Sequence, residues 1–251
     1  MQAILAALEE QHTELATLLD ALDDAGWRRP TRCEGWNLAD VVLHLAQTDE
    51  LALASAQGRF GEELDALAGG LELQGNVDDG AAAMVAHERD LPDAARLLRW
   101  RTGAAAVRDA LAASDPQRRV AWVAGQLSIQ TLATTRLAEC WIHTGDVAEA
   151  LDMEQKATDR LEHIARLAWR TLPYAFARDG RELAGPVAFD LGAPSGARWH
   201  FVPDTEPATV IEGTGADLCL VAARRVAAED TSLRGAGPDA GAVLELVRTY
   251  A

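Results

Sequence analysis

The chain has 251 residues, enough for one large domain or two modest ones, and 49% of them are hydrophobic, enough to bury a core. It carries 39 acidic and 23 basic residues, a formal net charge of −16. Because phosphate backbones and anionic lipids both require a positive protein face, this charge argues against nucleic-acid and membrane-surface partners.

The cysteines and the N-terminus indicate the compartment. Cys33, Cys140 and Cys219 are odd in number and widely spaced, so no disulfide framework is expected. Residues 1–22 form an acidic amphipathic pattern without a basic start, which is not typical of a signal peptide. No run of about eighteen apolar residues is present, so no transmembrane helix is expected. We expect a protein of the reduced cytoplasm.

The first two-thirds of the chain reads as helix, because apolar residues recur at three- and four-residue steps. Helices are predicted over residues 2–24, 37–58, 92–113, 127–151 and 158–178. Asn37 is the expected N-cap of the second helix, with Asp40 in its first turn. The stretch 58–91 is ambiguous, with a possible short helix over 81–89, and 119–126 reads as a loop.

The pattern changes after Gly180. Short alternating runs separated by Gly, Pro and Asp predict strands over 186–191, 197–202 and 208–212. Two further helices are expected over 216–228 and 239–250. The predicted architecture is therefore α then α+β, with a helical domain over 1–180 and a small α+β domain over 181–251.

A carboxylate and an imidazole lie four residues apart in the fourth predicted helix. Glu139 and His143 fall on the same helical stripe as Leu132, Val147 and Ala150, so both are expected to face the interior. Zn²⁺ accepts such nitrogen and oxygen ligands, and helical bundles build metal sites from facing helices. The alternative is a buried ion pair without a metal.

His44, on the buried edge of the second predicted helix, is the best candidate for a third ligand. Asp40 lies one turn before it and could orient its second ring nitrogen. Two nitrogens, one carboxylate and an open position would make a catalytic rather than a closed structural site. The alternative for His44 is a hydrogen-bonded core histidine. Cys140 is interpreted as a small core residue, not a nucleophile.

These residues carry a resemblance. The pattern consists of the segment Pro-Thr-Arg-Cys-Glu-Gly-Trp over residues 30–36, then His44, and later Glu139, His143 and Asp146. It resembles the N-terminal domain of the mycothiol-dependent maleylpyruvate isomerase family. That family belongs to the DinB-like metal-binding four-helix bundles. The resemblance implies that His44, Glu139 and His143 are zinc ligands, with water or a thiol in the open position.

The resemblance extends over most of the chain. It is to an actinobacterial branch of the family, some members of which are labelled as wyosine base formation proteins. The C-terminal part is similar to the small sterol-carrier-like α+β domain of the isomerase. The implied function is a zinc-dependent enzyme that uses mycothiol for isomerisation or S-transfer on a small electrophile. Alternatives are a non-catalytic protein that binds metal and a small ligand, or a tRNA wyosine-modification accessory, which the negative charge disfavours.

A carboxylate substrate would need a cationic partner. Arg224 and Arg225 follow the apolar run 218–223 on a predicted C-terminal helix and are the candidate catalytic residues, the alternative being a solvated helix face. The expected partners are a small electrophile or thiol, without nucleic acid or membrane, and a dimer is possible.

Overall fold

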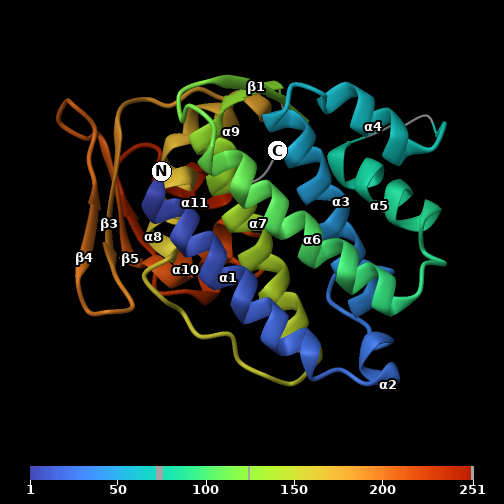
Figure 1. Cartoon of the computed structure of the whole chain (residues 1–251). Helices are drawn as coiled ribbons and strands as arrows, with labels where there is room; N and C mark the ends of the chain where they lie inside the picture. Colours follow the sequence, from blue (N-terminus) through green and yellow to red (C-terminus); the bar gives the residue numbers. More distant parts are fainter. Residues whose placement is uncertain (72–75, 124, 250–251) are drawn as a thin grey trace. The chain divides into compact units, whose positions relative to one another are not determined.

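The computed structural model of the chain describes residues 1–71, 76–123 and 125–249 (Figure 1). They form two compact units, Met1–Gln155 and Lys156–Ala251. The sequence places the boundary near residue 180, whereas the structure places it before the fifth predicted helix. That helix packs with the elements that follow it in the chain, and so belongs to the second unit.

Long helices pack side by side in the first unit. The helices predicted there are present as α1 (Gln2–Asp20), α3 (Leu38–Ala56), α6 (Asp93–Ala112) and α7 (Ile129–Ala150). α3 packs against α6 and α7, and α1 packs against α7 and α6 (Figure 1). α3 is buried along most of its length, which places the core of the unit around it.

The N-terminus of α3 is fixed as predicted. The side chain of Asn37 accepts a hydrogen bond from the backbone N–H of Asp40, and the Asp40 carboxylate accepts one from the backbone N–H of Asn37. This reciprocal arrangement is a capping box. The preceding loop folds back through a β-bridge between Pro30 and Asn37, with Gly35 in the left-handed region at φ +75°.

Short elements complete the first unit: α2 (Asp24–Trp27), α4 (Phe60–Ala68), α5 (Val77–His87), β1 (Arg119–Trp122) and β2 (Gly125–Ser128). The prediction of a loop over 119–126 is wrong, because β1 and β2 form an antiparallel ribbon. A ribbon of such short strands offers too few residues for an alternating pattern. Its anchor is Val120, which is buried against the core.

The second unit begins with a broken helix. The structure has α8 (Leu161–Arg170) and α9 (Leu172–Arg178) where one helix was predicted over 158–178. The break falls at Thr171, and Pro173 follows within the first turn of α9. A proline inside a helix removes a backbone donor and clashes with the preceding turn, so it is accommodated here at a helix start.

The sheet of the second unit has the strand order β4-β3-β5-β6. Its strands are β3 (Val187–Gly192), β4 (Arg198–Phe201), β5 (Thr209–Thr214) and β6 (Arg234–Ala236). β3 pairs antiparallel with β4 and parallel with β5. Phe189 lies opposite Phe201 and Ile211, and all three are buried. The three predicted strands are confirmed, and β6 was not predicted.

The described part of the second unit also has the α-helices α10 (Gly215–Ala222) and α11 (Ala240–Leu246) and a short 3-10 helix, Ala228–Asp230. α10 and α11 are shorter than the predicted helices over 216–228 and 239–250, whose last residue, 250, lies outside the described residues. α8, α10 and α11 contact the sheet through β4, β5 and β6. Across the described part of the chain, every helix is too short or too polar to span a bilayer.

Candidate metal centre

Two helices of the first unit carry the three residues predicted to bind metal. α3 carries His44, and α7 carries Glu139 and, one turn later, His143. The Nε2 atoms of both histidines lie 3.3 Å from Oε1 of Glu139. The two imidazole centroids are 5.0 Å apart. The potential ligand atoms of the three residues lie within 4.8 Å of one another, close enough to share one ion.

The ends of the two helices fix the register of these side chains. α7 begins after Ser128, whose hydroxyl accepts a hydrogen bond from the backbone N–H of Thr131. The four-residue step from Glu139 to His143 then places both side chains on one face. His44 lies one turn beyond the capping box at the start of α3.

The three side chains are coupled electrostatically. Burial alone would raise the pKa of Glu139, but its hydrogen bonds with His143 and His44 outweigh burial and hold that pKa well below its usual range. Burial alone would lower the pKa of His143, but hydrogen bonds with Asp146, Cys33 and Glu139 raise it well above its usual value. Burial lowers the pKa of His44. The centre therefore combines an ionised carboxylate with one imidazole whose pKa is raised and one whose pKa is lowered.

The second ring nitrogen of His143 has a carboxylate partner. Its Nδ1 lies 2.9 Å from Oδ2 of Asp146, three residues further along α7. The thiol of Cys33 donates a hydrogen bond to the same oxygen at 3.4 Å. A carboxylate behind a ligating histidine fixes the tautomer and the orientation of the ring, leaving Nε2 available to a metal.

The partner predicted for His44 is wrong. The Asp40 carboxylate is occupied by the capping box and by an ion pair with Arg89 at 3.1 Å. The Nδ1 atom of His44 is buried and has no hydrogen-bond partner among the described residues. The backbone N–H of the N-cap residue, Asn37, competes for the same carboxylate, and the capping interaction prevails.

The glycine–tryptophan loop reaches the centre through its last residue. The indole ring of Trp36 packs against the imidazole of His44, with ring centroids 5.1 Å apart. Cys33, from the same loop, contacts Asp146 as described above. The loop therefore touches both halves of the cluster, on α3 and on α7.

The donor set fits a zinc ion. Two ligand atoms that each lie about 2.0–2.1 Å from a tetrahedral ion are separated by roughly 3.3–3.4 Å. The two 3.3 Å separations between imidazole nitrogens and the Glu139 oxygen match this spacing. The histidine side chains are 9% and 8% exposed, whereas that of Glu139 is 26% exposed. If the three residues bind a metal ion, the exposed side of Glu139 leaves a position for a small molecule.

A buried ion pair joins the two helices about one turn away from the candidate ligands. Arg136 on α7 donates from Nε to Asp49 on α3 at 3.0 Å and from Nη2 to the hydroxyl of Thr48 at 2.9 Å. The Thr48 hydroxyl in turn donates to the backbone carbonyl of His44 at 2.9 Å. Arg136 precedes Glu139 by three residues, so this pair fixes the spacing of α3 and α7 where the ligands meet.

The segment that carries the candidate site matches a known family. A family model described as the mycothiol maleylpyruvate isomerase N-terminal domain matches residues 8–148, which include all three candidate ligands. The chain belongs to this family.

Relatives of similar length are found in mycobacteria. The uncharacterized proteins Rv0036c and MT0041, from two strains of Mycobacterium tuberculosis, are each 32% identical over 248 residues. The match covers 98% of this chain and 95% of each relative. The similarity therefore includes both units of the chain.

Solved structures show the same fold. The crystal structure of the mycothiol-dependent maleylpyruvate isomerase matches with a TM-score of 0.58 and 20% identity, over 94% of this chain and 92% of that one. A histidine-to-alanine mutant of that enzyme matches over the same shares, with a TM-score of 0.58 and 19% identity. The layout of helices followed by α+β is thus the fold of the isomerase.

The arginines predicted to bind substrate lie in the second unit. Arg224 and Arg225 follow the end of α10 rather than lying within it, and Arg224 is in the left-handed region at φ +59°. Arg224 donates to the backbone carbonyl of Glu245, and Arg225 to that of Ala223. That either arginine binds a substrate carboxylate stays a prediction.

Sequence reasoning missed the supporting residues of the centre. Asp146 was noted only as part of a family pattern, and Arg136 and Asp49 were not noted. A signal was available, since Arg136 is a charged residue three positions before Glu139 and therefore near the same inward stripe. Its partner on α3 could not be found without the register between the two helices.

Proposed function

We propose that this member of the family is a zinc-dependent enzyme that uses mycothiol to isomerise a small electrophilic substrate. The observation that carries the proposal is the meeting of His44, Glu139 and His143 in the segment that the family model matches. The fold shared with a mycothiol-dependent isomerase supports the thiol as cosubstrate. S-transfer to the electrophile would use the same activated thiol and differs only in the product released.

Each residue of the centre has a role in this proposal. A zinc ion held by His44, Glu139 and His143 would lower the pKa of a thiol bound beside it and favour the nucleophilic anion. Asp146 holds the His143 ring so that Nε2 points away from the Asp146 carboxylate. Trp36 covers one side of His44 and limits the access of water from that side.

We further propose the finer fold assignments. α1, α3, α6 and α7 would form a DinB-like four-helix bundle, a fold that builds metal sites from facing helices. The sheet of the second unit and the helices that contact it would form a sterol-carrier-like domain, with Arg224 or Arg225 available to a substrate carboxylate. Substituting each arginine separately tests that role through the KM of the substrate.

Metal content is the first test. Purified protein should hold about one zinc ion per chain by elemental analysis, and Glu139→Ala and His143→Ala should remove it. His200→Ala replaces an exposed histidine of the second unit and is the matched control. A wild-type protein that binds no zinc after refolding with excess metal would identify the cluster as an ion pair.

Mycothiol binding is the second test. In cobalt-substituted protein, added mycothiol should change the visible absorption spectrum and release protons, and His44→Ala should abolish both effects. Product analysis with maleylpyruvate then separates isomerisation from S-transfer. A spectrum that does not respond to mycothiol, together with zinc-dependent hydrolysis of electrophiles, would show that the centre activates water instead.

A further inference from the structure

A second group of metal-ligating side chains lies at the other nitrogen of the His143 ring. It consists of the Cys33 thiol, from the glycine–tryptophan loop, and of His143 and Asp146 on α7. Their potential ligand atoms, one from each residue, lie within 4.8 Å of one another. Nε2 of His143 faces Glu139 at 3.3 Å, whereas Nδ1 faces Asp146 at 2.9 Å. The two nitrogens of one imidazole therefore face two different sets of ligands.

Two proton donors converge on one carboxylate oxygen in this group. The Cys33 thiol donates to Oδ2 of Asp146 at 3.4 Å, and Nδ1 of His143 lies 2.9 Å from the same oxygen. The side chains of His143 and Asp146 are 8% and 1% exposed, so water has little access to this contact. A divalent cation in place of the two protons would leave the net charge of the group unchanged. The group can therefore accept a cation without adding a buried charge, which would be costly.

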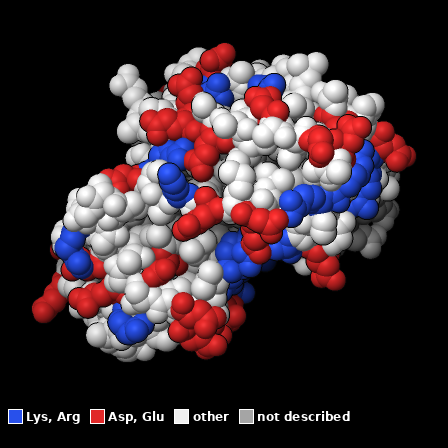
Figure 2. Space-filling model, turned by 90° about the horizontal axis from the view of Figure 1, so that it is seen from below, with Lys and Arg blue, Asp and Glu red and all other residues white. Residues whose placement is uncertain are grey.

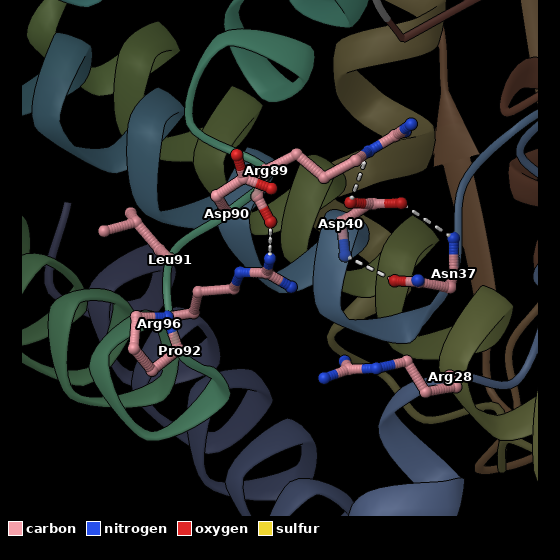
Figure 3. Close-up of a pocket in the computed structure, with 8 residues that line it drawn as sticks. All are labelled: Arg28, Asn37, Asp40, Arg89, Asp90, Leu91, Pro92 and Arg96. Carbon is pink, nitrogen blue, oxygen red and sulfur yellow. Dashed lines mark hydrogen bonds and ion pairs between the residues drawn. The ribbon is translucent and has the colours of Figure 1, made fainter.

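The loop that carries Cys33 is fixed by hydrogen bonds. The backbone carbonyl of Cys33 accepts a hydrogen bond from the N–H of Trp36 at 3.0 Å. Arg89 donates to the loop carbonyl of Gly35 at 3.1 Å and also to the carboxylate of Asp40, in the first turn of α3. Figure 3 shows the contact between Arg89 and Asp40. The thiol is thus held toward α7 before any ion binds, which lowers the conformational cost of binding.

The surrounding charge favours a cation. Two arginines that precede Cys33 in the loop, Arg29 and Arg32, form ion pairs with Asp152 and Glu149. Their positive charges are therefore balanced close to the group. The chain as a whole has a net charge of −16, and acidic side chains are widely spread on the face shown in Figure 2. A field of this sign raises the local concentration of cations.

The donor types select the kind of ion. A thiolate beside an imidazole and a carboxylate suits zinc and other thiophilic ions, whereas magnesium and calcium take oxygen ligands. Tetrahedral zinc separates a nitrogen from an oxygen ligand by roughly 3.3–3.5 Å, and a sulfur from an oxygen by roughly 3.5–3.7 Å. The corresponding separations here, 2.9 Å and 3.4 Å, are shorter, so an ion must displace the Asp146 carboxylate slightly. Cys33 is half-buried, which leaves a solvent-facing side for a fourth ligand.

We propose that Cys33, His143 and Asp146 form a second cation site for a thiophilic divalent ion, with His143 shared between this site and the candidate metal centre. The site is the weaker of the two, because an ion must replace two protons and widen the contact between His143 and Asp146. Protein purified without added metal therefore still holds about one ion per chain. Only the shared role of His143 rests on the proposed function, since Cys33 and Asp146 are not ligands of the candidate metal centre.

Cadmium titration of the full chain tests this site, because a thiolate bound to cadmium gives a charge-transfer band in the ultraviolet. Wild-type protein should bind about two cadmium ions per chain, one of which produces the band. Cys33→Ser should bind about one ion and give no band, since serine can keep the hydrogen bond to Asp146 but supplies no thiolate. Asp146→Asn should weaken the ion that produces the band by at least about 10-fold, the usual effect of losing even a partner behind a ligand.

Two control variants separate this site from its surroundings. Glu139→Gln removes a ligand of the candidate metal centre alone and should keep the band. Cys219→Ser removes a buried thiol of the second unit and should keep it as well. If the wild type binds only the ion that produces the band, the result contradicts the candidate metal centre and supports the second site.

Four results would overturn the proposal. The first is a wild-type protein without a band at saturating cadmium. The second is a band of equal size in Cys33→Ser, which would assign the thiolate to another cysteine. The third is unchanged cadmium affinity in Asp146→Asn, which would show a thiol binding the ion without the carboxylate. The fourth is loss of the band in Glu139→Gln, which would make Cys33 a ligand of the candidate metal centre and leave the proposed function intact.

Discussion

His12 is a buried imidazole outside the candidate metal centre. It lies on α1, and Arg108 donates a hydrogen bond to its Nδ1 at 2.6 Å. Burial, Arg108 and Arg136 lower its pKa from 6.5 to about 3. The folded protein therefore keeps this ring neutral at a pH where the unfolded chain protonates it.

This shift predicts acid sensitivity. A histidine whose pKa is lower in the folded state costs no stability above pH 6.5, and it destabilises the fold progressively as the pH falls from 6.5 toward 3. The free energy of unfolding should lose about 1.4 kcal/mol per pH unit from this residue. Urea unfolding of wild type and His12→Gln at several pH values measures the difference, since the other titrating groups are common to both. Parallel pH curves would contradict the shift.

The thiols differ in accessibility. Cys140 and Cys219 are buried, and burial raises the pKa of both, whereas Cys33 is half-buried at the glycine–tryptophan loop. We expect one thiol to react with a chromogenic disulfide in the native protein and all three in denaturant. Cys33→Ser should remove the native reaction. Fewer than three thiols in denaturant without reductant would contradict the prediction that no disulfide forms.

The three side chains of the candidate metal centre could be predicted from the sequence, but their hydrogen-bond partners could not. The spacing of Glu139 and His143 and the position of His44 in an apolar helix identified the three side chains that the structure brings together. The same reasoning assigned Asp40 to His44. It failed because a first-turn carboxylate has two possible partners, and only the structure shows that the capping box and Arg89 take it.

At the scale of elements, the contact between α3 and α7 depends on a buried charge pair. Arg136 and Asp49 are each 2% exposed, and one oxygen of Asp49 has no partner among the described residues. Removing one member leaves the other buried and uncompensated, which costs about 3–5 kcal/mol, whereas replacing both by apolar residues is often neutral. The pair therefore adds little net stability but defines how the two helices meet.

A double-mutant cycle tests this view. Arg136→Met should lower the free energy of unfolding by about 3–5 kcal/mol, and the double variant Arg136→Met, Asp49→Leu should recover most of the loss. The recovered double variant should still bind zinc about 10-fold more weakly, because the spacing of the ligands is no longer fixed. A double variant less stable than either single one, or one with unchanged zinc affinity, would contradict this role.

The elements themselves were predictable where the pattern is long. The helices around α1, α3, α6 and α7 each repeat their apolar residues over several turns, and all were found within a few residues. The ribbon of β1 and β2 and the strand β6 are too short to show a period. The break at Thr171 was missed because the apolar pattern continues across it, although Pro173 was a visible signal.

At the scale of the molecule, the division into units makes a prediction about fragments. A fragment ending at Gln155 contains the complete first unit and all three candidate ligands. It should be helical by circular dichroism and bind zinc with the affinity of the full chain. A fragment ending at residue 180 should unfold with a similar midpoint but expose apolar surface from α8, whose partners lie in the second unit. If the fragment ending at Gln155 is unfolded and the fragment ending at residue 180 is folded, the boundary lies near residue 180.

The boundary could not be found from sequence for a physical reason. Composition changes where strands begin, near Gly180, but a compact unit is defined by which elements bury one another. The apolar face of α8 fits a helical bundle as well as it fits the side of a sheet. Its contacts with α10 and β4 place it in the second unit, and these contacts join residues far apart in the chain.

The irregular segment between the two units contains the single lysine of the chain. Lys156 is exposed and lies in a stretch without helix or strand, between α7 and α8. A lysine-specific endoprotease therefore has one target bond in the whole protein, and it lies at the junction of the two units. Limited digestion of the native protein should give two fragments and no others, each of them an intact unit. An amine-reactive label applied after the N-terminus is blocked would attach at Lys156 alone, so one reagent can report on the segment where the two units meet in the sequence.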